Sequence, residues 1–247
     1  MNVRNILISQ QPPKANSPYA EITAKYGVKF DFVPFFSIEP LSSREFRAQR
    51  INILDHTAIV FSARSTIDAF FHLCSELRVK IPETMKYFCT TEAVAMYLQK
   101  HIVYRKRKIF FGDGTASSLI SLIGTKHKGE KFLVATSDSA NNDITRVFEE
   151  QGFDFSSAIF VKPVSRDLKS LALPDYDMIV LYNPSDVKSL FENFPDFSQG
   201  GIRFVSYGKS VVKAMTDKGL SIEISAPTSA APSVAKAIEL YLEKSDK

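Results

Sequence analysis

The sequence contains no tryptophan, two cysteines and four histidines. The cysteines, Cys74 and Cys89, lie among apolar residues and form no CxxC pair, so we expect buried thiols in a reducing compartment. The histidines are scattered without the spacing of metal ligands, and surface or satisfied core positions are expected for them. The sequence therefore predicts no metal site.

Common cofactor motifs are also missing. Neither GxGxxG nor GxxxxGK[ST] occurs, and there is no GxSxG, which excludes the usual dinucleotide, nucleotide and serine-hydrolase fingerprints. We expect no cofactor. No apolar run approaches the roughly 20 residues that a membrane span needs, and Ile6–Ile8 near the N-terminus is too short for a signal peptide. A soluble, cytoplasmic protein without a membrane partner is expected.

Charge of one sign is not in large excess. The chain has 31 Lys and Arg against 27 Asp and Glu, a net charge of +4. This balance weakly favours small acidic ligands and says little about nucleic acid. The one basic run, Tyr104–Lys108, could grip phosphates or form the solvated end of a helix. We expect the second, and no nucleic-acid partner.

The sequence does contain short apolar runs that alternate with amphipathic helical segments, a pattern typical of α/β proteins with parallel sheets. Met178–Tyr182 is such a run, and Asn183–Asp186 ends the strand and caps a helix. A buried strand that leads into a helix N-terminus leaves unpaired N–H groups, which are a ready site for an anion.

The same unit occurs twice. Ile59–Phe71 aligns without a gap on Ile179–Phe191, which predicts two similar α/β lobes of the flavodoxin or Rossmann type. We expect a discontinuous domain of residues 1–36 and 166–247, and an inserted domain of residues 37–165. Extended segments 28–36 and 157–164 are predicted to pair as a two-stranded β linker, with a cleft between the lobes.

Polar residues gather where the predicted strands meet helix N-termini. Each hydroxyl or amide taken alone could be a helix cap. Their shared position at the carboxyl ends of parallel strands is where open α/β sheets bind ligands. We expect this edge to bind a polyanion. The candidate residues are Ser9, Ser62, Arg64, Ser65, Thr90, Thr91, Asn183, Ser185, Gly208, Lys209 and Ser210.

Several stretches carry a family resemblance. Ile51–Ile59 reads INILDHTAI and Pro82–Cys89 reads PETMKYFC, as in a divergent branch of the uroporphyrinogen-III synthase family. Tyr182–Val187 is similar to the family's F-[ST]-S-P-S-G-V element, and Tyr207–Ser210 to its I-G-x-T-T element. Ala226–Ser229 resembles its A-x-x-P-T element. The likeness extends over nearly the whole chain.

This resemblance implies a lyase of tetrapyrrole and haem biosynthesis. Members close hydroxymethylbilane, a linear tetrapyrrole with eight carboxylates, into uroporphyrinogen III with inversion of ring D and loss of water. The reaction is expected to pass through a spirocyclic intermediate without a cofactor. The family also implies two α/β lobes joined by a two-stranded ladder, and a monomer.

The chain differs from the family pattern at positions that the family is expected to use in the reaction. A Tyr of the second linker, expected to help the hydroxyl leave, is replaced by Val161. A motif Ser is Asn183, and a Thr pair is Ser210–Val211. We therefore predict that Tyr182 or Tyr207 supplies the phenol. The alternative is a two-lobed tetrapyrrole- or anion-binding protein that has lost the chemistry.

Overall fold

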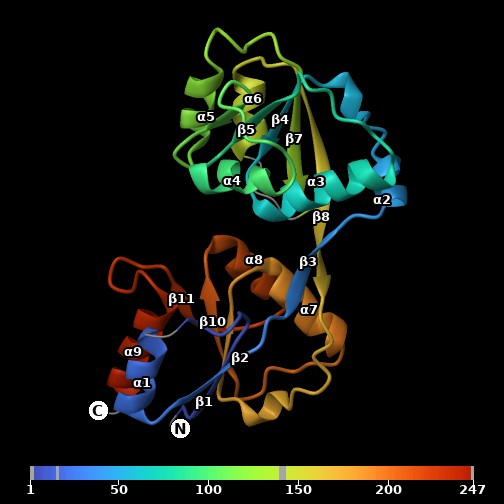
Figure 1. The fold of residues 1–247 in the computed structure, drawn as a ribbon. Helices are drawn as coiled ribbons and strands as arrows, with labels where there is room; N and C mark the ends of the chain where they lie inside the picture. Colours follow the sequence, from blue (N-terminus) through green and yellow to red (C-terminus); the bar gives the residue numbers. More distant parts are fainter. Residues whose placement is uncertain (1–2, 15–16, 139–142, 246–247) are drawn as a thin grey trace. The chain divides into compact units, whose positions relative to one another are not determined.

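The computed structural model describes residues 3–14, 17–138 and 143–245. The chain divides into two compact units, which we call the terminal unit (residues 1–37 and 164–247) and the inserted unit (residues 38–163). The sequence placed these boundaries at 1–36 with 166–247 and at 37–165. Each unit contains a largely parallel sheet with helices on both faces (Figure 1), which confirms the predicted α/β class with two parallel-sheet lobes.

The terminal unit has a five-stranded sheet in the order β11-β10-β9-β1-β2, and its strand pairs are parallel. Its strands are β1 (Asn5–Ile8), β2 (Lys29–Phe32), β9 (Met178–Leu181), β10 (Arg203–Tyr207) and β11 (Ile222–Ala226). Its helices are α1 (Pro18–Tyr26), α7 (Pro184–Asn193), α8 (Lys209–Asp217) and α9 (Val234–Ser245), with a 3-10 turn, η3 (Leu173–Asp175).

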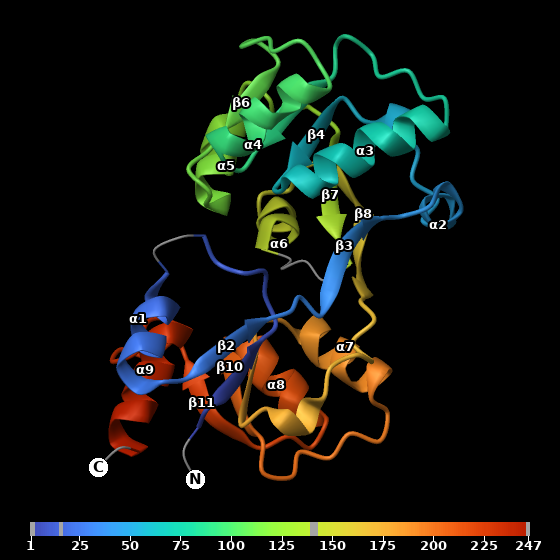
Figure 2. The ribbon, with the colours of Figure 1, turned by 60° about the horizontal axis from the view of Figure 1, so that its bottom comes forward.

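Helices cover both faces of this sheet. One face packs against Ile22 of α1 and Ile238 of α9, and the other against Leu190 of α7 and Met215 of α8. Figures 1 and 2 both show α1 beside α9 and α7 beside α8. This burial on both faces explains why the central strand β9 reads as a continuous apolar run rather than an alternating one.

The inserted unit has a six-stranded sheet in the order β3-β8-β7-β4-β5-β6. Its strands are β3 (Phe36–Pro40), β4 (Ala58–Phe61), β5 (Lys86–Cys89), β6 (Ile109–Phe111), β7 (Phe132–Ser137) and β8 (Phe155–Ser165). Its helices are α2 (Ser43–Ala48), α3 (Arg64–Glu76), α4 (Glu92–Tyr97), α5 (Ala116–Ile123) and α6 (Asp143–Glu150), with 3-10 turns η1 (Ile53–Asp55) and η2 (Leu98–Lys100).

The core of the inserted unit is also divided between two faces. Helices α3 and α4 pack on one face, and α5 and α6 on the other. Cys74 and Cys89 are both free and buried, as predicted, and burial raises the pKa of each thiol to about 12. Neither cysteine is therefore a reactive thiolate at neutral pH. In the described ranges of the whole chain, no helix is long and apolar enough to cross a membrane.

Strands β3 and β8 lie side by side where the chain passes between the units. The amide of Leu41 donates to the carbonyl of Phe160, and the amide of Arg166 to that of Phe35, both at 2.9 Å. The residue numbers run in opposite directions, so the pair is antiparallel.

The predicted pairing of 28–36 with 157–164 is therefore wrong in detail. Residues 29–32 form β2, which pairs with β1 in the terminal sheet, and β8 is instead paired by β3. Pro34 lies between β2 and β3, where a residue without an N–H interrupts the ladder. One predicted strand is thus two strands in two different sheets.

The middle of β8 belongs to the core of the inserted unit. Phe160 is 1% exposed, and its ring centroid lies 5.0 Å from that of Phe46 and 5.6 Å from that of Phe70. Val161, at the position of the expected family Tyr, is also buried in this cluster. The side chain at 161 therefore fills the core and presents no group to solvent.

Truncating Phe160 should test this packing. Phe160→Ala leaves a cavity among aromatic rings, and we expect it to lower the free energy of unfolding by about 3–5 kcal/mol in urea titrations. Val103→Ala is the control, because Val103 is 78% exposed and its loss should cost less than about 0.5 kcal/mol. A cost for Phe160→Ala no larger than that of the control would contradict the assignment.

Candidate functional site

The carboxyl ends of β1, β9 and β10 meet at one edge of the terminal sheet, because these adjacent strands are parallel. Ser9 follows β1, Tyr182 follows β9, and Tyr207 ends β10. Helices α7 and α8 begin at the same edge. Predicted site residues from distant parts of the sequence are therefore brought together here.

Asp186 organises the turn between β9 and α7. Its side chain is fully buried, and Oδ2 accepts hydrogen bonds from the Ser9 hydroxyl at 2.8 Å and from the amides of Tyr182 and Asn183 at 2.9 Å. Asn183 Oδ1 accepts from the Ser185 amide at 2.9 Å. Backbone N–H groups at the start of α7 thus have acceptors within the protein.

This arrangement corrects one expectation. The turn at Asn183 and Ser185 was predicted to leave unpaired N–H groups for an anion, but Asp186 and Asn183 occupy them. The hydroxyl of Ser9 is also engaged. Sequence reasoning missed Asp186, although its spacing of three residues from Asn183 is that of a capping box.

The second carboxylate oxygen of Asp186 has no such partner. Oδ1 is buried and accepts no hydrogen bond within the described part of the chain. Burial raises the pKa of Asp186 to about 6, against the opposing effect of the Ser9, Tyr182 and Asn183 donors. The protonation state of Asp186 therefore changes close to neutral pH.

Helix α8 begins differently. Its N-cap is Gly208, with φ of 91°, and no side chain in the described ranges caps its first N–H groups. The first two helical residues, Lys209 and Ser210, are exposed. This N-terminus therefore combines open N–H donors with the positive side chain of Lys209. A cation in the first turn is unfavourable to the helix dipole. An anion would satisfy both the N–H donors and the cation.

Helix α3 of the inserted unit has the same open start. Its N-cap is Ala63, which has no side-chain acceptor, and Arg64 and Ser65 are exposed at the first helical positions. In the internal repeat Ala63 aligns with Asn183. The two copies therefore share a strand–turn–helix path, but the copy at Asn183 is closed by side chains and the copy at Ala63 is open.

The remaining predicted residues of the inserted unit lie around the next strand end. Thr91 caps α4 by accepting from the Val94 amide at 3.3 Å. Thr90 is buried, and its hydroxyl donates to the carbonyl of Ser62 at 3.5 Å, while the Ser62 side chain is exposed. Thr90 and Thr91 thus hold the edge together rather than offering free groups.

The two candidate phenols have different surroundings. The Tyr182 hydroxyl lies 3.0 Å from that of Tyr19, and burial raises the pKa of both phenols. Tyr207 is 38% exposed, its ring centroid lies 5.5 Å from that of Tyr182, and its hydroxyl makes no hydrogen bond within the described residues. Tyr207 is therefore accessible to solvent, whereas Tyr182 is held between Tyr19 and the Tyr207 ring.

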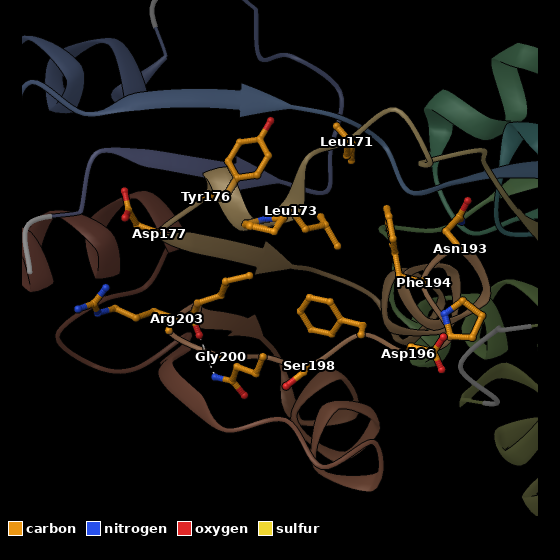
Figure 3. Close-up of a pocket in the computed structure, with 16 residues that line it drawn as sticks. Leu171, Leu173, Tyr176, Asp177, Asn193, Phe194, Asp196, Ser198, Gly200 and Arg203 are labelled. Atoms are coloured by element: carbon orange, nitrogen blue, oxygen red, sulfur yellow. Dashed lines mark hydrogen bonds between the residues drawn. The ribbon is translucent and has the colours of Figure 1, made fainter.

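A cavity of about 800 Å³ lies at the opposite, amino edge of the terminal sheet (Figure 3). Asp177 and Arg203 are at one end, and Asn193 and Asp196 at the other. The Asn193 side chain bonds to Arg166, Leu168 and Ser189 in its wall. This cavity contains none of the predicted site residues. Across the described ranges, no cluster of His, Cys, Asp and Glu could hold a metal ion.

The family model described as uroporphyrinogen-III synthase HemD matches residues 17–236. The chain belongs to the uroporphyrinogen-III synthase family. Its fold is similar to that of uroporphyrinogen-III synthetase from Helicobacter pylori, with 14% identity, a TM-score of 0.56 and coverage of 98% of this chain and 99% of that one.

A mutant uroporphyrinogen III synthase from the extremely thermophilic bacterium Thermus thermophilus has 13% identity and a TM-score of 0.50, with 98% of each chain covered. At such identities these likenesses show the two-lobed fold. No curated protein sequence matched the chain.

The pKa of Asp186 predicts a pH-dependent stability. The value is raised from 3.8 to about 6, so folding favours the protonated carboxyl. Its contribution is fully present below pH 3.8 and is lost as the pH rises through about 6. Relative to Asp186→Asn, which removes the titration, the wild-type free energy of unfolding should fall by about 2–3 kcal/mol between roughly pH 4 and pH 8.

Urea titrations at several pH values measure this difference. Asp196→Asn is the matched control, because it removes an exposed carboxyl group outside the turn and so tests whether the change belongs to Asp186. Parallel profiles for wild type and Asp186→Asn would show that Asp186 does not titrate in this range.

Proposed function

We propose that the chain is a uroporphyrinogen-III synthase, a cyclising lyase that converts hydroxymethylbilane to uroporphyrinogen III and water. The observation that carries the proposal is the placement of a cation at an uncapped helix N-terminus in each unit, Lys209 on α8 and Arg64 on α3. Without an anion, each cation opposes the dipole of its own helix. A substrate with eight carboxylates supplies the missing charge.

Binding rests on backbone donors supported by side chains. At α8 the amides of Lys209 and Ser210 take one carboxylate, with the Lys209 ammonium beside it. Such charge-assisted bonds are stronger than neutral ones. At α3 the amides of Arg64 and Ser65 do the same with the guanidinium of Arg64. The closed turn at Asp186 takes no carboxylate, because its donors are occupied.

Tyr207 is the proposed proton donor. Its hydroxyl gives a proton to the terminal hydroxyl of ring A as the C–O bond breaks, so that water leaves and an azafulvene forms. The substituted carbon of ring D then attacks the carbon from which the hydroxyl left, and a spirocyclic pyrrolenine forms. The spiro compound fragments and recloses with ring D inverted, and the proton lost from the tetrapyrrole restores the phenol. Overall, one water molecule is released for each tetrapyrrole that is cyclised.

Tyr182 has a supporting part in this scheme. Its hydroxyl is bound to Tyr19, and its ring lies against that of Tyr207. Together these contacts hold the Tyr207 ring without presenting the Tyr182 hydroxyl to the substrate. Orientation of the folded tetrapyrrole excludes direct closure to the type I isomer.

A second candidate function is tetrapyrrole or anion binding without turnover. The observation that favours it is Val161, which is buried in the core of the inserted unit and supplies no phenol at the family position. Incubation with hydroxymethylbilane, followed by chromatography of the oxidised products, separates the two. Type III product above the spontaneous type I background supports the synthase. Type I alone, with tight binding of uroporphyrinogen by calorimetry, supports the binding protein.

Variants at the α8 edge should affect turnover and binding separately. We expect Tyr207→Phe to lower kcat by about 10²–10⁴-fold, because it removes the proton donor. Lys209→Ala should raise KM about 10-fold with little change in kcat. Tyr182→Phe should lower kcat by less than about 10-fold, since it keeps the ring and loses only the contact with Tyr19.

Steady-state formation of the type III isomer is the measurement. Tyr241→Phe is the matched control, because Tyr241 lies on α9 and its loss of a hydroxyl should leave both constants unchanged. If neither Tyr207→Phe nor Tyr182→Phe slows type III formation, neither of these two phenols is the proton donor.

A further inference from the structure

Arg64 is accompanied by polar side chains that the proposed function does not use. We call Asp68, Tyr97, Lys100 and His101 the Asp68 cluster. Asp68 lies four residues after Arg64 on α3, so the two side chains share one face of the helix. Tyr97 ends α4, and Lys100 and His101 follow in and after η2.

The Asp68 carboxylate binds three donors. The Tyr97 hydroxyl donates to it at 2.6 Å, His101 Nε2 at 2.7 Å and the Lys100 ammonium at 3.0 Å. Burial acts to raise the pKa of Asp68, but these three bonds outweigh it and lower the pKa to about 2. An ionised carboxylate only accepts hydrogen bonds, so Nε2 of His101 carries the proton.

The imidazole of His101 is fixed from its other side. Its ring is stacked on Phe71, with centroids 4.6 Å apart and an interplanar angle of 7°. The side chain of His101 is only 19% exposed. Asp68 is therefore held by a residue that is itself packed, and the Tyr97 hydroxyl bonds to an anchored carboxylate.

The ring of Tyr97 faces the guanidinium of Arg64. The Arg64 Cζ atom lies 5.3 Å from the ring centroid, within the range of a cation–π contact. The Lys100 ammonium lies 5.2 Å from the same ring centroid, but it also donates to the Tyr97 hydroxyl at 3.0 Å. Arg64 makes no side-chain hydrogen bond or ion pair among the described residues, so its contact with the Tyr97 ring is not backed by a polar bond.

We infer that Tyr97 is a positioning residue for Arg64, and that Asp68 and His101 fix the Tyr97 ring in place. The inference rests on the proposed function, in which Arg64 binds a substrate carboxylate. A guanidinium already ordered over Tyr97 loses less conformational entropy when that carboxylate arrives. Loss of the ring should therefore weaken substrate binding and leave the chemical step largely unchanged.

The first test needs no substrate. Nuclear magnetic resonance relaxation of the Arg64 side-chain Nε–H group reports its order in the wild type, in Tyr97→Leu and in Tyr104→Leu. Tyr104 is the matched control, because it packs partly buried against the same core. We expect the Arg64 order parameter to fall by at least about 0.2 in Tyr97→Leu and to stay constant in Tyr104→Leu. An unchanged value in Tyr97→Leu would overturn the inference.

The second test uses KM for hydroxymethylbilane. Tyr97→Leu should raise KM about 2- to 5-fold, the fold-change that corresponds to one exposed cation–π contact, with kcat nearly constant. In an Arg64→Ala background the same substitution should have no further effect, because Tyr97 acts through Arg64. Independent, multiplicative effects of the two substitutions would overturn the inference.

Tyr97→Phe separates the ring from its hydroxyl. This variant keeps the face that Arg64 contacts and loses the hydroxyl's bonds to Asp68 and Lys100, so we expect a smaller rise in KM than with Tyr97→Leu. An equal or larger rise would exclude the ring as the platform. If the wild type forms no type III isomer, the proposed function fails, and the relaxation measurement still decides whether Tyr97 orders Arg64.

Discussion

Each helix that follows a buried parallel strand begins with N–H groups that need acceptors, and this constraint determines the candidate site. The chain meets it in two ways. At α7 the acceptors are internal, since Asp186 and Asn183 bind the first amides. At α3 and α8 no side chain in the described ranges takes this place, and a cation stands at the first helical position. A closed turn stabilises the fold, whereas an open one is available to a ligand.

The closed turn also supports the open one beside it. Asp186 joins the ends of β1 and β9 through Ser9 and the Tyr182 amide. Tyr182 in turn contacts Tyr19 and lies against the Tyr207 ring. The accessible phenol at the start of α8 is therefore backed by a series of contacts that begins at a buried carboxylate. Contacts of this kind hold the Tyr207 ring more firmly than a mobile loop would.

The sequence was sufficient to predict the α/β class, the internal repeat and the edge at which polar residues gather, because these follow from hydrophobic periodicity and strand direction. It did not reveal which helix N-termini are open. That depends on whether a side chain such as Asp186 folds back on its own turn, and aligned residues Ala63 and Asn183 behave differently. The Asp68 cluster was also missed, because Asp68, Tyr97 and His101 come from separate elements. The linker pairing was misassigned because Pro34 splits one extended segment between two sheets.

The position of β9 between β1 and β10 has a consequence for the order of folding during synthesis. The inserted unit is continuous in sequence, so all of its residues leave the ribosome before β9 does. Strands β1 and β2 are made first, yet the central partner of β1 is made more than half a chain later. Until β9 is made, β1 has only one of its two partner strands, and Ile6, Leu7 and Ile8 lack the C-terminal strands and helices that bury them. Closure of the terminal sheet therefore depends on contacts of long sequence separation, and we expect this unit to be the slower of the two to fold.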